Sequence, residues 1–448
     1  MSVTASEFKK RRHQLMGMMP AGSIALVPGA NIQRRNRDVY FPFRQDSDFY
    51  YLTGFTEPES LLILAPGREH GQEILFCADR DPHAERWDGE RMGPERASQM
   101  LGVDDAFPYA DMEDILPGLL EGRERIYINL GEYPEFDSRI LGWVADIRKR
   151  EAGGAQPPGE FMQLKHLLHE QRLYKSAQEL KLMRRAANIT ADAHVRAMRE
   201  VRPGMKESQL EAELTYEFMK QGASAAAYPS IVGGGNNACV MHYIANQASL
   251  KKHDLVLIDA GCEYEYYAAD LTRTFPVNGK FNAPQRAIYD IVLQANLDAI
   301  DQCRPGNHFN APHEAALRTM VQGLVELGLL QGEVDTLLAE QDEIKDFCPH
   351  KTSHWLGLDV HDVGDYRIDG EWRELEPGMV LTIEPGIYIP HNETTEHLPA
   401  KYRGIGVRVE DDVLITRHGC EVLTAAAPKQ ADAIEALMAE RSLTAAHG

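Results

Sequence analysis

Two aspartates stand at the ends of neighbouring aliphatic runs near the middle of the chain. Residues 255–261 read Leu-Val-Leu-Ile-Asp-Ala-Gly and end their aliphatic run at Asp259, and residues 269–275 return with Asp270. Such runs predict two buried strands that pair as a hairpin with one carboxylate on each arm. Directly opposite residues have Cβ atoms about 4.5–5.5 Å apart, so two such carboxylates repel unless a cation lies between them. Two unrelated turn aspartates would be the simpler interpretation of this pair alone.

The same arrangement recurs further along the chain. Residues 380–386 read Val-Leu-Thr-Ile-Glu-Pro-Gly and repeat the pattern of residues 255–261, and the first helical segment before each run ends at Arg-Pro-Gly. A second acid also follows on a later strand of each copy, which indicates an internal duplication. Turn statistics do not explain four acids at matching places, so a metal site is expected. Its candidate carboxylate ligands are Asp259, Asp270, Glu384 and Glu410.

Three histidines lie in the chain between the first pair of acids and the second pair. They are His350, His354 and His361. Lys351 and Thr352 follow the first histidine, so this is not the H-E-x-x-H zinc motif, and Gly357 favours extended backbone over a helix. A histidine alone is usually structural. Because three cluster in sequence between placed carboxylates, we expect at least one to be a metal ligand and the others to act on substrate.

Four carboxylates and one imidazole form a hard, oxygen-rich ligand set. This set suits Mn²⁺ best, with Co²⁺ or Zn²⁺ able to substitute. Four negative charges match two divalent cations. Two such ions about 3.5–4 Å apart lower the pKa of a bridging water, supply hydroxide at neutral pH and polarise a carbonyl. Peptide hydrolysis is therefore expected, whereas phosphoester hydrolysis is disfavoured because no P-loop or basic cluster is present to receive phosphate.

The composition excludes several other classes of partner. The net charge is −21 with no long basic block, so nucleic acid is not an expected partner. The six cysteines are scattered without a C-x-x-C pair, which argues against a zinc knuckle and a disulfide framework and fits a reducing cytoplasm. No run of about 18 apolar residues is present, so no membrane partner is expected.

The 448 residues predict two domains. Short aliphatic runs alternate with helical segments between residues 24 and 153, which is typical of an α/β domain. Residues 151–159 have linker composition, and the domains are taken as residues 1–172 and 173–448. The second begins within a helical pattern over 161–202, followed by a helix over 207–221. The aromatic segment 41–55 is compatible with a packed loop.

The order of the candidate ligands resembles that of the dinuclear pita-bread metallopeptidases. That order is Asp259, Asp270, His354, Glu384 and Glu410, with His242 and His361 alongside. Two longer segments, 354–362 and 40–55, are similar to bacterial aminopeptidase P, whose members remove an N-terminal residue when proline comes next. The resemblance implies an α/β N-terminal domain of the creatinase and aminopeptidase P type. It also implies an α+β pita-bread catalytic domain with a pseudo-twofold internal duplication.

The resemblance assigns a role to each metal ligand. Asp259 chelates one metal, His354 and Glu384 hold the other, and Asp270 and Glu410 bridge both. Glu384 is also expected to take the proton from the attacking water.

The resemblance assigns substrate roles as well. His361 and His242 would hold the substrate and stabilise the tetrahedral oxyanion. The residues expected to line the proline side of the cleft are His350, Tyr388 and Arg408.

Two alternative functions and an assembly remain open at this stage. Prolidase, which cleaves Xaa-Pro dipeptides, shares all five ligands, and a metal-free pita-bread binding protein is a further alternative. The resemblance also implies a homo-oligomer, either a tetramer or a dimer, that assembles through the N-terminal domain. Trp87 is a candidate contact with a neighbouring cleft or, equally, an ordinary surface anchor.

Overall fold

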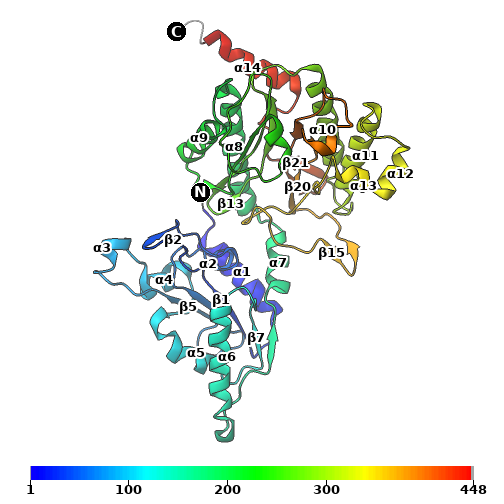
Figure 1. The fold of residues 1–448 in the computed structure, drawn as a ribbon. Helices are drawn as coiled ribbons and strands as arrows, with labels where there is room; N and C mark the ends of the chain where they lie inside the picture. The colour runs from blue at the N-terminus through cyan, green and yellow to red at the C-terminus, as the bar shows by residue number, and fades with distance from the viewer. Residues whose placement is uncertain (1, 445–448) are drawn as a thin grey trace. The chain divides into compact units, whose positions relative to one another are not determined.

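The computed structural model describes residues 2–444, which form two compact units (Figure 1). The first unit spans residues 2–172, and the second begins at Leu173. Among the described residues, no helix is long and apolar enough to span a membrane. All six cysteines are free thiols.

The N-terminal unit is built on one six-stranded mixed sheet. Its strands lie in the order β6-β5-β4-β1-β7-β8. Strands β1, β4 and β5 are antiparallel neighbours, and the outer pairs are parallel. The four aliphatic runs expected as strands form β1, β4, β5 and β7. The strand bounds are β1 (Ser23–Pro28), β4 (Leu61–Leu64), β5 (Glu73–Cys77), β6 (Asp105–Pro108), β7 (Arg125–Tyr127) and β8 (Glu160–Met162).

Helices cover both faces of this sheet, as expected for an α/β domain. Alternate strand residues such as Ile24 and Leu26 share one core with Trp143 of α6, while α1, α2 and α4 pack on the remaining elements. The helices are α1 (Ala5–Met18), α2 (Ser47–Thr53), α4 (Gly93–Leu101), α5 (Met112–Leu120) and α6 (Pro134–Arg148). Smaller elements are β2 (Arg34–Asn36), β3 (Val39–Tyr40), α3 (Glu85–Asp88), η1 (Tyr109–Asp111) and η2 (Glu151–Gly153).

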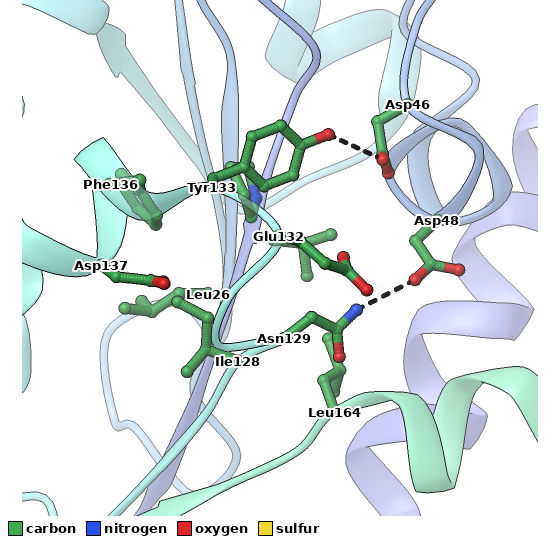
Figure 2. A pocket seen from close by; sticks show the side chains of 12 residues that line it. Leu26, Asp46, Asp48, Ile128, Asn129, Glu132, Tyr133, Phe136, Asp137 and Leu164 are labelled. Carbon is green, nitrogen blue, oxygen red and sulfur yellow. Dashed lines mark hydrogen bonds between the residues drawn. The ribbon is translucent and has the colours of Figure 1, made fainter.

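The aromatic segment 41–55 contains a buried helix and is more than a packed loop. Asp46 caps α2 by accepting a hydrogen bond of 2.9 Å from the Phe49 amide, and Gly54 ends the helix with a φ of 66°. The hydroxyl of Tyr133 also donates to Asp46 at 2.9 Å (Figure 2). The segment is therefore fixed by its own acids, because each satisfies donors that would otherwise be unpaired.

Asp48 joins this helix to the last helix of the unit. Its Oδ1 lies 2.7 Å from Nη1 of Arg172, and both side chains are buried. Its Oδ2 lies 3.1 Å from His169 and 3.2 Å from Asn129, the latter contact being drawn in Figure 2. Burial alone would raise the pKa of Asp48, but the charge of Arg172 and the bond to His169 lower it to about 2.

The second unit contains two successive groups of helices and strands. Each group begins with two helices that pack together, α8 with α9 and α10 with α11. These helices are α8 (Ala177–Glu200), α9 (Glu207–Lys220), α10 (Ala283–Asp301) and α11 (Ala311–Glu326). A three-stranded antiparallel sheet follows in each group, β10-β11-β14 in the first and β17-β20-β21 in the second. This repeat is the duplication expected from the sequence.

The strands and small elements of this unit carry the candidate site. The first group holds β9 (Ala225–Ala226), β10 (Ile231–Gly234), η3 (Gly235–Cys239), β11 (Leu255–Asp259), β12 (Cys262–Tyr264), β13 (Tyr267–Ala268) and β14 (Thr272–Pro276). The second holds β17 (Val380–Ile383), β18 (Gly386–Ile389), η4 (Glu393–Thr395), β19 (Ile405–Arg408), β20 (Asp411–Thr416) and β21 (Gly419–Val422). Between and after them lie α12 (Val334–Glu340), α13 (Asp342–Lys345), β15 (Arg367–Ile368), β16 (Glu371–Trp372) and α14 (Ala431–Thr444).

The helical pattern over 161–202 forms two helices, so the expectation of one continuous helix is wrong. Helix α7 (Lys165–Leu173) ends, and α8 begins four residues later at Ala177. The break is a capping box, in which the Ser176 hydroxyl accepts from the Glu179 amide and the Glu179 carboxylate accepts from the Ser176 amide at 2.8 Å. Both donors are satisfied only if a new helix begins here.

Replacing Asp48 with asparagine tests the buried ion pair. Removing one partner of such a pair costs about 3–5 kcal/mol because the other charge stays buried, so the free energy of unfolding should fall by roughly that amount. Urea denaturation followed by fluorescence measures it, with the exposed Asp38→Asn as the matched control. An Asp48→Asn variant as stable as this control would contradict the assignment.

The same ion pair predicts a pH dependence of stability. The folded pKa of Asp48 is lowered from 3.8 to about 2, so the pair contributes fully above pH 3.8 and its contribution is lost as the pH falls through 2. Acid denaturation of Asp48→Asn should therefore lack this part of the pH dependence.

Candidate metal centre

The two aspartates of the first half lie close together but not directly opposite. Asp259 is the last residue of β11 and pairs with Thr272, so the expected face-to-face pairing with Asp270 is wrong by two residues. The hairpin β12–β13 separates the two strands and turns through Glu265 and Tyr266, both at positive φ. Strand pairing register is not contained in the aliphatic pattern, which explains the error.

Tyr228 brings these two carboxylates together. Its hydroxyl lies 2.6 Å from Oδ1 of Asp259 and also contacts Oδ1 of Asp270. Burial and the neighbouring carboxylates raise the pKa of Tyr228 well above its usual value, so the hydroxyl keeps its proton. One proton cannot serve two ionised carboxylates at once. A cation at this position would therefore satisfy acceptors that the chain alone leaves short of donors.

The two glutamates of the second half occupy matching strand ends. In the ladder between β17 and β20, Ile383 pairs with Asp411, and Glu384 and Glu410 are the next residues beyond that pair. The amide of Glu384 donates to the carbonyl of Thr352 at 2.8 Å. The ladder and this bond fix the direction in which the second pair of carboxylates points.

Glu410 is tied to the first half by Thr272. The Glu410 amide donates to the Thr272 carbonyl at 3.1 Å, and the Thr272 hydroxyl donates to Oε2 of Glu410 at 2.7 Å. The same threonine is the ladder partner of Asp259. One residue therefore positions a carboxylate from each half.

His354 completes the cluster from an extended segment, as the sequence predicted. Its Nε2 lies 3.5 Å from Oδ2 of Asp270 and 3.5 Å from Oε1 of Glu384. Its Nδ1 lies 3.0 Å from the carbonyl of Trp355, which fixes Nδ1 as the donor and leaves Nε2 facing the carboxylates. One ligand atom each of Asp270, His354 and Glu410 lie within 4.8 Å of one another. This is the orientation that a metal-ligating histidine requires.

Burial and charge repulsion together determine the electrostatics of the cluster. Burial raises the pKa of Glu384 to about 7, and burial with neighbouring carboxylates raises the pKa of Asp259 and Glu410. Burial also opposes the charged form of His354, but the hydrogen bond and charge of Asp270 raise its pKa to about 9. These residues fit one or more divalent cations, because bound positive charge would relieve the same repulsion.

A hydrogen-bonded chain lines one side of the cluster. Arg408 donates to Oδ2 of Asp259 at 2.6 Å and to the Tyr388 hydroxyl at 2.8 Å. The Tyr388 hydroxyl lies 2.7 Å from Nε2 of His350, whose Nδ1 lies 2.8 Å from the Lys351 carbonyl. Burial, with the charge of Arg408, lowers the pKa of His350 to about 4, so this ring is neutral with Nδ1 as its donor. The three residues expected together on one side of the site are thus in contact.

The two remaining histidines flank the cluster. The ring of His361 lies 4.3 Å from that of His354, and the next residue, Asp362, forms a buried ion pair of 2.9 Å with Lys175. Burial and the charge of His354 lower the pKa of His361. His242 is exposed on the segment after η3, and its charge contributes to lowering the pKa of both His350 and His361. The candidate site residues therefore gather around one centre, except that His242 is linked to it only through its charge.

Sequence reasoning missed three polar residues at the centre. They are Tyr228, Thr272 and Arg273, none of which is among the residues expected at the site. A local signal existed for the last two, since they follow Asp270 after one leucine and place a charged side chain in an otherwise apolar strand. No local signal marks Tyr228, because it reaches Asp259 through the pairing of β9 with β12.

The buried carboxylates and the oriented imidazole define the chain as a metal-dependent hydrolase of the two-domain metallopeptidase type. Metallopeptidase family M24 matches residues 181–417, and the N-terminal domain of aminopeptidase P matches residues 8–127. The chain belongs to metallopeptidase family M24 and carries the aminopeptidase P N-terminal domain.

Known relatives resemble the chain over almost its whole length. The Xaa-Pro aminopeptidase of Escherichia coli is 46% identical over 437 residues, or 97% of this chain and 98% of that protein. The Xaa-Pro aminopeptidase of Haemophilus influenzae is 44% identical over 96% of this chain and 97% of that protein. The structure of Pseudomonas aeruginosa aminopeptidase PepP matches with a TM-score of 0.97 and 56% identity, over 98% of this chain and 99% of that chain. The resemblance and the fold class expected from the sequence are confirmed.

Replacing Glu410 with glutamine should have opposite effects with and without metal. Without metal, the substitution removes one member of a repelling group, so the thermal midpoint should stay equal or rise. With saturating Mn²⁺, a ligand is lost, so the metal-induced rise should shrink. A ligand present at 100 times its dissociation constant adds about 2.7 kcal/mol to the free energy of unfolding. Calorimetry after EDTA dialysis and after Mn²⁺ addition measures both, with the exposed Glu393→Gln as control. Equal metal-induced shifts in the two variants would contradict the site.

Proposed function

We propose that this protein is a Xaa-Pro aminopeptidase, which removes the N-terminal residue from peptides with proline in second position. One observation carries the proposal. Four carboxylates at strand ends gather with His354 in a chain that is alike, over nearly its full length, to named Xaa-Pro aminopeptidases. The structure of the E. coli enzyme with the inhibitor Pro-Leu matches this chain with a TM-score of 0.95, which supports a site for proline-containing peptides.

The metal assignment is part of the proposal. We assign two divalent ions to Asp259, Asp270, His354, Glu384 and Glu410, with Mn²⁺ as the best match to this ligand set and Co²⁺ or Zn²⁺ as substitutes. When bound, such ions activate water at neutral pH and polarise a carbonyl. The carboxylate-rich ligand set and the repulsion among its carboxylates support the assignment of divalent ions.

The side chains around the ions have separate tasks. Glu384 is proposed to accept a proton from the attacking water. His361 and His242 are proposed to donate hydrogen bonds to the carbonyl oxygen of the scissile peptide as it gains negative charge. The free amino group of the substrate is proposed to meet the acidic cluster. This requirement restricts the enzyme to the N-terminal peptide bond.

Prolidase is the alternative within the same chemistry. It would use the same five ligands, but the near-complete likeness to Xaa-Pro aminopeptidases favours substrates longer than a dipeptide. A metal-free binding protein is disfavoured, because all five ligand side chains are present and directed at one centre.

The proposal extends to the cellular setting and assembly. A reducing cytoplasm is compatible with six free cysteines. We propose a homo-oligomer, either a tetramer or a dimer, that assembles through the N-terminal unit. Trp87 lies on α3 and is 82% exposed, so it is available for a contact with another copy.

The substrate class is tested with two peptides. Manganese-loaded protein should release arginine from Arg-Pro-Pro and act poorly on the dipeptide Arg-Pro. Release of free arginine, measured by chromatography, distinguishes the two functions. Hydrolysis of the dipeptide alone would replace the proposal with prolidase.

Replacing His361 with alanine tests the oxyanion role. Loss of one such donor lowers kcat by about 10²–10³, while the metal ligands remain in place. Metal content by mass spectrometry should be unchanged, and kcat should fall much more than KM rises. Loss of bound metal together with activity would mean instead that His361 holds the ligands in position.

A further inference from the structure

A cavity of the second unit is lined by residues that neighbour the metal centre in the chain. Its volume is about 640 Å³, within the range of ordinary small-molecule sites of about 300–1,000 Å³. Its lining includes Phe309, His313, Lys351, Ser353, Tyr366 and Trp372, and we call this cavity the aromatic subsite. Asp365 and Arg367 also line it, and the Arg367 guanidinium lies 3.9 Å from the centre of the Trp372 ring.

The aromatic subsite shares a chain segment with the proline side of the proposed cleft. Its wall includes Lys351, Thr352 and Ser353, which lie in the chain between His350 and His354 of the metal centre. His350 Nδ1 lies 3.7 Å from Oε2 of Glu384. Lys351 is the next residue along the chain, and successive Cα atoms are about 3.8 Å apart. A peptide whose proline lies beside His350 can therefore reach the subsite with its following residue.

The inner wall of the subsite is a preformed group of aromatic rings. The ring of Phe309 lies 4.6 Å from that of Tyr366, 4.6 Å from that of Trp355 and 6.2 Å from that of Trp372. Tyr366 and Trp355 are stacked with an angle of 6° between their planes. Rings held this way offer apolar surface at low entropic cost. They suit a bulky apolar or aromatic side chain.

Two polar groups of the subsite are available to a ligand, because Lys351 is exposed to solvent and Ser353 carries a buried hydroxyl. Among the described residues no carboxylate lies within ion-pair distance of Lys351, whose Nζ has His313 Nε2 at 3.5 Å as its neighbour. Burial lowers the pKa of His313 to about 4, so this neighbour is neutral and does not balance the charge. Ser353 is 8% exposed, and its buried hydroxyl has no hydrogen-bond partner in the described part of the chain. A ligand with a carboxylate and a further polar group would offer a partner to the exposed Lys351 and to the buried hydroxyl of Ser353.

We propose that the aromatic subsite binds the residue that follows proline in the substrate. The side chain of that residue lies against Phe309, Tyr366 and Trp372, and a C-terminal carboxylate at that residue pairs with Lys351. This inference rests on the proposed function and narrows the substrate class to Xaa-Pro tripeptides with a large apolar third residue.

The rings are tested with tripeptides that differ only in the third residue. For the manganese-loaded protein, kcat/KM should be about tenfold higher for Arg-Pro-Phe than for Arg-Pro-Ala, because a buried aromatic ring contributes at least that much. The half-exposed Trp372 can be replaced with alanine, and this variant should lose most of the preference. Equal kcat/KM values for the two peptides in the unsubstituted protein would overturn the subsite.

The pairing of Lys351 with the C-terminal carboxylate of the substrate is tested with Arg-Pro-Phe and its C-terminal amide. A hydrogen-bonded ion pair predicts that the free acid exceeds the amide in kcat/KM by about tenfold. In Lys351→Gln the two values should become equal, whereas the exposed control Lys251→Gln should keep the difference. An unchanged ratio in Lys351→Gln would overturn the role of Lys351.

These outcomes distinguish a failure of the aromatic subsite from a failure of the proposed function. If no peptide with proline in second position is hydrolysed, the proposed function fails. If Arg-Pro-Ala is cleaved while third-residue preference and acid preference are both absent, the function stands and the aromatic subsite fails. Thermal midpoints and metal content measured for every variant show whether a lost preference reflects misfolding.

Discussion

Repulsion among four carboxylates, two of them buried and two half-buried, is the constraint on which the rest of the catalytic unit depends. Little water reaches these groups, so each must be held by the backbone and by donors before a cation can bind. The chain meets this requirement by placing every one of the four at or just beyond the end of a strand. Antiparallel ladders fix the strand ends. The backbone therefore brings the acids together, and their side chains need little further ordering.

The two halves are locked together by a second buried charge. Arg273 is fully buried and donates to the Glu410 carbonyl at 2.6 Å and to the Asp411 carboxylate at 2.8 Å. Lys429 pairs with the other oxygen of Asp411 at 2.7 Å. Removing one member would leave uncompensated charge in the core, so these contacts oppose any sliding of one half past the other. The ligand cluster needs that rigidity, because it draws two acids from each half.

The sequence was informative about residue identity and less so about position. The repeat of Leu-Val-Leu-Ile-Asp-Ala-Gly as Val-Leu-Thr-Ile-Glu-Pro-Gly identified Asp259 and Glu384 as strand-end acids, and both lie there. The offset between Asp259 and Asp270 was not predictable, because periodicity says which residues form strands but not which residues pair. The helix break before α8 was readable in principle, since Ser176 and Glu179 have capping-box spacing. Tyr228 depends on long-range pairing and left no local trace.

The hydrogen-bonded chain beside the cluster, proposed as the proline side of the site, offers an explanation of how proline is accepted. Most sites that hold a peptide backbone present an acceptor for the substrate N–H, and proline would leave that acceptor unpaired. Here the acceptors are already occupied. The Tyr388 oxygen accepts from Arg408, and Nε2 of the neutral His350 accepts from the Tyr388 hydroxyl. Neither of these two acceptors needs an N–H from the substrate, so a proline nitrogen leaves neither of them unpaired. Selectivity for proline then becomes a matter of ring shape against these side chains.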